Sequence, residues 1–168
     1  SAAHSTIIIN NTNISELIKH KSYKRAPQNV VVNIKENIDN LEWNASHDGY
    51  FKNYNKIIKR KLIISKKTYS IIGQDEIIST KINSKKESYS IRFHLMPFSK
   101  CITTNDRKTI LIKTKLNQSW VFKSNSPIVL EDSIYIGDGK RVEQNKQIVI
   151  YGSIQNNKKI EKWSLIKS

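Results

Sequence analysis

Residues 89–95 read YSIRFHL, so apolar and polar side chains alternate along the chain with a period of two. Successive side chains of a β-strand point to opposite faces, so this alternation predicts a strand with one buried face and one wet face. No stretch of the chain holds a helical apolar stripe over three turns. Similar runs, rich in β-branched and aromatic residues and separated by turn signals such as Asp48-Gly49, occur at 110–116, 120–122, 134–136 and 147–151. The sequence therefore predicts an all-β fold, a large antiparallel β-sandwich of about ten to twelve strands forming one domain over residues 1–168.

The composition is that of a folded domain, because 38% of the 168 residues are hydrophobic and 26% are charged. No apolar run approaches the length of a membrane helix, which predicts no membrane insertion. The single cysteine, Cys101, excludes an internal disulfide framework and a multi-cysteine zinc site. The first strand, at Ile7, follows the chain start with almost no lead-in, and we expect the chain to be part of something longer.

The net charge of +15 attracts polyanions such as nucleic acid, anionic membranes or acidic polysaccharides. The basic residues are 24 lysines and only 5 arginines, and the chain also holds 28 isoleucines and 17 asparagines. Isoleucine, lysine and asparagine share A- and T-rich codons, so part of the charge is explained by a biased genome. Arginine reads phosphates and bases better than lysine does, and its scarcity argues against a nucleic-acid partner.

His4 and His47 are candidate metal ligands, because a sandwich can bring their two positions to one end. With Asp48 they would offer two imidazoles and a carboxylate, a common zinc set. The alternative is that each histidine is a structural residue near a turn. His20 lies in a basic stretch, and we expect a solvated loop there with no functional role.

Arg92 and His94 lie two residues apart on the polar face of their strand, where a guanidinium and an imidazole can hold a carboxylate. They can equally pair with an acid across the sheet. Arg60 lies between Lys59 and Lys61 in a strand, so an inward Arg60 needs a buried acid as partner. Core packing is the favoured role of the tryptophans, Cys101 has no neighbouring base, and no glycine-rich nucleotide loop or nucleophile elbow is present.

Several of these pieces occur in an order that resembles the C-terminal β-sandwich region of the heparinase II/III-like proteins. The resemblance covers essentially the whole chain. It rests on Ala3-His4-Ser5-Thr6, Asn11 to Leu17, Ser46-His47-Asp48-Gly49-Tyr50, Lys59-Arg60-Lys61-Leu62, Gly73 to Glu76, Ile91 to Pro97, Trp120-Val121-Phe122, Leu130 to Tyr135 and Gln147-Ile148-Val149.

The resemblance implies an α/α toroid followed by a large sandwich, and lyase chemistry by β-elimination on uronic-acid-containing polysaccharides. In that family the proton-transferring Tyr/His pair and its partner lie mainly on the toroid, which this chain lacks, while the sandwich closes the substrate cleft. Carried over by position, His4 and His47 would line the cleft, and Tyr50, Arg60, Arg92 and His94 would contact substrate. Related sequences commonly have a histidine where this chain has Ile58, and a second one where it has Met96; both differences argue against zinc.

The expected function is therefore that of the sandwich domain of a polysaccharide lyase, forming one wall of the cleft and inactive alone. Its partners would be an acidic polysaccharide, heparin-, heparan- or alginate-like, and the missing toroid, with no nucleic acid bound. The alternative is a stand-alone carbohydrate-binding module for anionic polysaccharide. Family analogy favours a periplasmic or envelope location.

Overall fold

The computed structural model describes residues 4–18, 22–81, 85–137, 139, 141–155 and 157–168. They form fourteen strands and one short helix, and every strand pair is antiparallel. The elements are β1 Ile7–Ile9, β2 Glu16–Ile18, β3 Ser22–Arg25, β4 Val30–Glu36, β5 Asn40–Tyr50, α1 Phe51–Tyr54, β6 Lys56–Ser65, β7 Ser70–Ser79, β8 Glu87–His94, β9 Lys100–Thr103, β10 Thr109–Lys113, β11 Ser119–Ser124, β12 Ile128–Tyr135, β13 Glu143–Ile154 and β14 Lys158–Lys167.

The strands form two facing layers. A small sheet has the order β1-β8-β13-β12, and a large sheet has the order β4-β5-β6-β7-β14-β11-β10-β9, while β2 and β3 pair separately. The predicted all-β antiparallel sandwich is confirmed. The strand number exceeds the predicted ten to twelve because β1, β2, β3 and β9 have only three or four residues, too few for a period of two to be recognised.

The core lies where the small sheet covers the large sheet, and we call this region the centre. Inward side chains of the small sheet, such as Ile91 and Ile150, are fully buried there against Ile110 and Phe122 of the large sheet. Trp163 on β14 packs edge-on against Phe93, with ring centroids 4.6 Å apart. Burial of these side chains supplies most of the driving force for bringing the two layers together.

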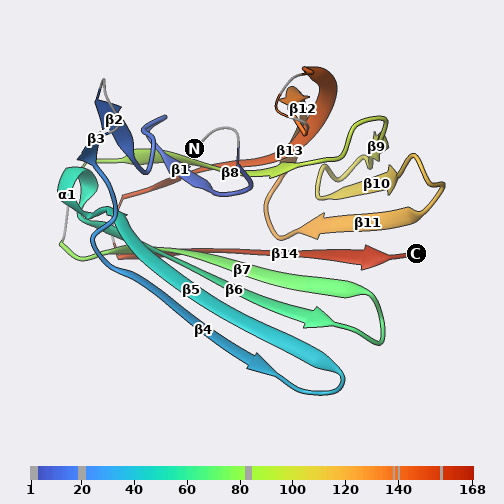
Figure 1. Cartoon of the computed structure of the whole chain (residues 1–168), viewed down its shortest axis with the longest axis horizontal. Coiled ribbons are helices and arrows are strands. Elements are labelled where there is room, and N and C mark those ends of the chain that lie inside the picture. Colours follow the sequence, from blue (N-terminus) through green and yellow to red (C-terminus); the bar gives the residue numbers. More distant parts are fainter. Residues whose placement is uncertain (1–3, 19–21, 82–84, 138, 140, 156) are drawn as a thin grey trace.

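The large sheet extends beyond the small sheet on the β4 side, as the free ends of β4 to β6 show (Figure 1). Val30, Val32 and Ile34 pair in register with His47, Ala45 and Trp43, so these side chains share the inner face. We call Val30, Val32, Ile34 and Trp43 the overhang. The three aliphatic side chains are 63%, 48% and 60% exposed although they point inward.

The only described helix, α1, has four residues and ends at Asn55, whose φ of 52° is left-handed. The Asn55 N–H donates to the Phe51 carbonyl at 2.8 Å, which closes the single turn between β5 and β6. None of the described residues forms a helix that is long and apolar enough to cross a membrane.

Candidate functional site

Arg60 lies on the inner face of β6, because the period of two places it with Ile58 and Leu62. Its Nε donates to Asp75 Oδ1 at 2.6 Å and its Nη2 donates to Oδ2 at 3.0 Å. Asp75 is its direct neighbour in register on β7 and is only 1% exposed. Trp163 Nε1 also donates to Asp75 Oδ2, at 2.8 Å. The predicted buried acid beside Arg60 is therefore present, and the two parallel bonds fix the plane of the guanidinium.

The segment His4–Thr6 connects Arg60 to β8. Arg60 Nη1 donates to the Ser5 carbonyl at 2.6 Å, while Ser5 Oγ accepts from the His94 N–H at 3.1 Å. The Arg92 N–H donates to the Thr6 carbonyl at 3.1 Å. Four of the residues selected from the sequence, His4, Arg60, Arg92 and His94, thus lie around one short segment, His4 being part of it.

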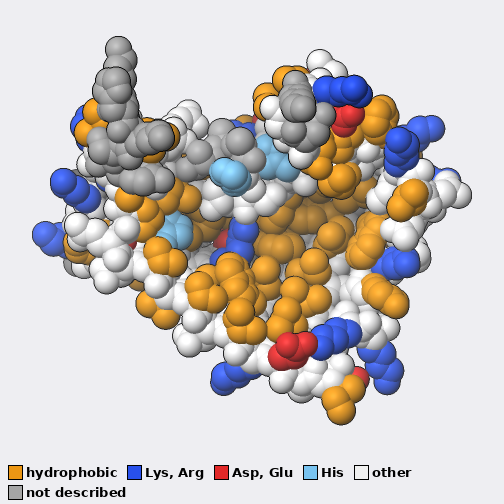
Figure 2. Space-filling view, viewed as in Figure 1, with side chains coloured by type: hydrophobic (Ala, Val, Ile, Leu, Met, Phe, Trp, Pro, Cys, Tyr) orange, Lys and Arg blue, Asp and Glu red, His pale blue; other side chains and the backbone are white. Residues whose placement is uncertain are grey.

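A hollow of about 290 Å³ lies beside this segment. Its lining includes Ser5, Thr6 and Ile7 from the β1 side and the overhang residues Val30, Val32 and Trp43 from the large sheet. His47, Arg60 and Asp75 of the large sheet also line it. A second, mostly apolar hollow of about 300 Å³ also includes Ser5 and is lined by aromatic rings, among them Phe93, Trp120, Phe122 and Trp163. Figure 2 shows the apolar surface of the hollowed face with histidine side chains along it.

His47 is an uncharged hydrogen-bond donor in the lining of the first hollow. Burial lowers the pKa of its imidazole; Asp48 raises the pKa and the positive charge of Arg60 lowers it, and the net direction is downward from 6.5. Nδ1 accepts a hydrogen bond from the Gly49 N–H at 3.2 Å. The neutral ring therefore carries its proton on Nε2, which can donate to a ligand oxygen.

Tyr50 is fully buried, so its ring does not reach the surface of the hollow. Its hydroxyl lies 3.0 Å from the Thr12 carbonyl and 3.2 Å from the Ile7 carbonyl. In the described structure Tyr50 links β5 to the segment around β1.

Arg92 and His94 point away from the centre, because Phe93 between them points inward. Arg92 Nη1 contacts Glu131 Oε2 at 3.3 Å, and His94 Nδ1 lies 3.0 Å from Ser133 Oγ. Of the two alternatives for Arg92, pairing with an acid across the sheet is the one observed. The main-chain N–H groups of these residues bind the segment His4–Thr6, while their side chains lie on the opposite face of the small sheet.

Two of the three residues suggested for zinc, His47 and Asp48, use ligand atoms in hydrogen bonds within the protein. Both Asp48 carboxylate oxygens accept hydrogen bonds, from the Gln28 N–H and from Asn29 Nδ2, each at 2.8 Å. Nδ1 of His47 accepts a hydrogen bond from the Gly49 N–H, and the register neighbour of His47 on β6 is the buried Ile58, which cannot bind a metal. Within the described part of the chain, no three His, Cys, Asp or Glu side chains are grouped to hold a metal ion. His20 lies outside the described residues.

Ser5, Asp75 and Trp163 build the site but were not selected as site residues from the sequence. The sequence did contain an indication for Asp75. It lies two or four residues from Ile71, Gly73 and Ile77, so in a strand it is a charged residue on the same face as apolar ones. A charge at such a position needs a buried partner. Ser5 acts mainly through its carbonyl group, which no sequence pattern identifies.

These observations define a class, an antiparallel β-sandwich with a partly open face and an arginine-histidine hollow beside its first strand. The sequence matches the family described as Heparinase II/III-like, C-terminal, over residues 1–164. The chain therefore belongs to the heparinase II/III-like C-terminal family. No curated protein sequence matches the chain significantly.

Solved structures with the same fold include heparan sulfate lyase HepC from Pedobacter heparinus, with a TM-score of 0.76 and 10% sequence identity. A heparinase III, the BT4657 gene product, has a TM-score of 0.75 and 12% identity. In both comparisons 98% of this chain is covered, but only 24% of the other. The chain thus spans about a quarter of the length of these proteins, and at these identities the likeness shows the fold.

Proposed function

We propose that the chain is the sandwich domain of a lyase that cleaves uronic-acid-containing polysaccharides by β-elimination, and that it forms one wall of the substrate cleft. The observation that carries the proposal is the hollow beside His4–Thr6, where His47 and Arg60 meet in a member of this family. The lyase names of the structural neighbours support the reaction class.

β-Elimination needs three events at a uronate residue. The carboxylate is stabilised as charge develops, the proton on the adjacent carbon is removed by a base, and the C4–O bond breaks as an acid protonates the leaving oxygen. The hollow offers the Nε2–H of His47 to the carboxylate, and the exposed His4 precedes the Ser5–Ile7 wall in sequence. Arg60 is paired with Asp75, and its hydrogen bond to the Ser5 carbonyl positions the segment His4–Thr6.

The hollow does not supply the base. His47 has its Nδ1 lone pair bonded to Gly49 and its proton on Nε2, so in this tautomer neither nitrogen accepts a further proton. Tyr50 is buried beneath the surface. We therefore expect the base to come from a toroid outside this chain, and the isolated chain to be inactive. The overhang, with inward apolar side chains about half exposed, is the surface that this toroid would cover.

An NMR titration of the chain with a uronate tetrasaccharide at near-physiological salt tests the proposal. We expect the ring signals of His47 to shift and the variant His47→Ala to weaken binding at this hollow about tenfold, the loss of one hydrogen bond to a charged group. Gln144→Ala, an exposed change on β13 outside the hollow, should leave binding unchanged.

Two results would contradict this function. Unsaturated uronate product formed by the isolated chain would overturn its inactivity. The chain could also bind the tetrasaccharide and single-stranded DNA of matched charge equally, and lose both on adding salt. That result would show that the binding is a nonspecific attraction of polyanions to the net positive charge.

A further inference from the structure

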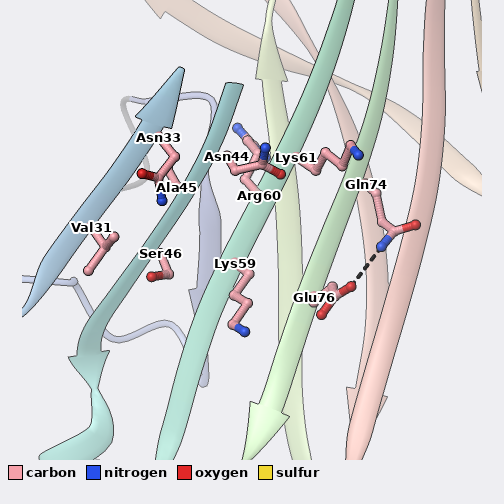
Figure 3. A pocket seen from close by; sticks show the side chains of 10 residues that line it. All are labelled: Val31, Asn33, Asn44, Ala45, Ser46, Lys59, Arg60, Lys61, Gln74 and Glu76. Carbon is pink, nitrogen blue, oxygen red and sulfur yellow. Dashed lines mark hydrogen bonds between the residues drawn. The ribbon is translucent and has the colours of Figure 1, made fainter. Parts of the chain in front are cut away.

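The large sheet carries a further hollow, of about 380 Å³, on its outer face over β4 to β7. Its side chains are shown in Figure 3, and we call it the outer-face groove, lined by Asn33, Asn44, Ser46, Lys59, Lys61 and Gln74. Asn33, Asn44, Lys61 and Gln74 are successive register neighbours across the four strands. They therefore form one polar row, on the side of the sheet opposite the His47 hollow.

Two carboxylates at the groove fix the orientation of two amides. Gln74 Nε2 donates to Glu76 Oε1 at 2.7 Å, and Asn44 Nδ2 donates to Glu42 Oε1 at 2.9 Å. An ionised carboxylate only accepts hydrogen bonds, so the NH₂ group of each amide must face it. The amide oxygens of Asn44 and Gln74 are then left as acceptors for hydroxyl groups.

Both carboxylates are already compensated by lysines. Lys61 Nζ lies 3.0 Å from Glu42, and Lys158 Nζ lies 2.9 Å from Glu76. Hydrogen bonds from Asn44 and Lys61 hold the pKa of Glu42 below its usual value. Partial burial raises the pKa of Glu76, but the hydrogen bonds from Lys158 and Gln74 outweigh it and the net shift is downward. Each acid thus stays ionised and neutralised near pH 7.

Lys59 is the exposed cation of the groove; its charge also helps to lower the pKa of Glu76, but by less than that of Lys158. It is exposed on the same face between Ser46 and Glu76 in register, and within the described chain no carboxylate oxygen lies within 4.0 Å of its Nζ. An exposed ammonium beside oriented amide acceptors offers complementary groups to a ligand that has both a negative charge and several hydroxyls.

We propose that the outer-face groove binds an anionic sugar residue, with Lys59 pairing its carboxylate or sulfate and the amide oxygens of Asn44 and Gln74 accepting its hydroxyls. Nucleic acid fits less well, because no aromatic ring lines the groove for base stacking. Arg60, the one arginine among the lining residues, commits its guanidinium to Asp75 on the inner face. The groove is a contact separate from the cleft wall proposed above.

The test is an NMR titration that follows the side-chain amide signals of Asn33, Asn44 and Gln74. The probes are a uronate tetrasaccharide, its carboxyl-reduced neutral analogue and a single-stranded tetranucleotide. We expect the uronate tetrasaccharide to shift these signals, and Lys59→Gln to weaken binding at this site about tenfold, about 1.4 kcal/mol. Lys113→Gln removes the same charge from an exposed position on β10 and should change nothing.

Three results would overturn the proposal: unshifted amide signals, an equal loss of affinity in Lys59→Gln and Lys113→Gln, or equally tight binding of the tetranucleotide. The ring signals of His47 report binding at the hollow beside His4–Thr6 in the same titration. Failure at the outer-face groove is thereby separated from failure of the cleft-wall function.

Discussion

The centre and the overhang are built from similar strands, but inward side chains are buried in the centre and largely exposed in the overhang. In the centre even charged groups are buried: Lys56 is fully buried and its Nζ lies 2.8 Å from Glu87 Oε2, joining β6 to β8. In the overhang Val30 and Ile34 are 60% exposed or more. The difference shows that burial follows from coverage by the second layer, and that hydrophobicity alone does not determine it.

The largest expected effect is at the ion pair of the centre. Lys56→Met leaves Glu87 buried without its cation, and we expect the free energy of unfolding to fall by about 3–5 kcal/mol in urea denaturation. The double variant Lys56→Met/Glu87→Leu removes both charges and should recover most of that loss. A loss below about 1 kcal/mol in the single variant would show that the pair is not shielded from water.

A matched pair of truncations compares the two regions directly. Ile150→Ala in the centre creates a cavity and should cost about 2–5 kcal/mol. Val32→Ala in the overhang removes methyl groups that are already half exposed and should change stability by less than about 0.5 kcal/mol. Urea denaturation of both variants measures the contrast. Similar losses at the two positions would mean that the overhang is covered in solution, for instance by a second copy of the chain.

The smallest expected effect is a pH dependence at the border of the two regions, where His47 lies. Its pKa is lowered in the fold, so below about pH 6.5 the unfolded chain binds a proton that the folded chain does not. This contribution to stability is therefore complete above that pH and is lost as the pH falls. We expect the melting temperature of His47→Gln to drop less than that of the original protein between about pH 8 and about pH 5. An equal drop in both proteins would show that the imidazole is solvated in the fold.

The long strands were predictable because they have enough residues to show their period. Residues 89–95 alternate cleanly, and β8 covers almost all of them. The three-residue β1 has no visible alternation, and all three of its isoleucines are buried, so its register on β8 comes from packing. Arg60 was predictable in part: the sequence showed that an inward Arg60 requires a buried acid, but only the register of β6 with β7 identifies Asp75.

The candidate site was predictable to a similar extent. Motif order selected His4, His47, Arg60, Arg92 and His94, and the fold gathers four of these around the segment His4–Thr6. The sequence placed Arg92 and His94 on the polar face of their strand but did not reveal that this face lies away from the hollow. Nor did it reveal that Tyr50 is buried, or that Asp48 is bonded to Gln28 and Asn29. Each of these depends on which groups far apart in the chain become neighbours.

The sequence by itself determined the strand periodicity, the antiparallel sandwich class and the basic charge, because these follow from composition and from side-chain order along each strand. It also determined that an inward Arg60 needs a buried acid. The tertiary structure alone decided the uncovered overhang, the Ser5 bridge between Arg60 and β8, and the polar row of the outer-face groove. Those features arise from strand register and layer overlap, which bring together residues that are not neighbours in sequence.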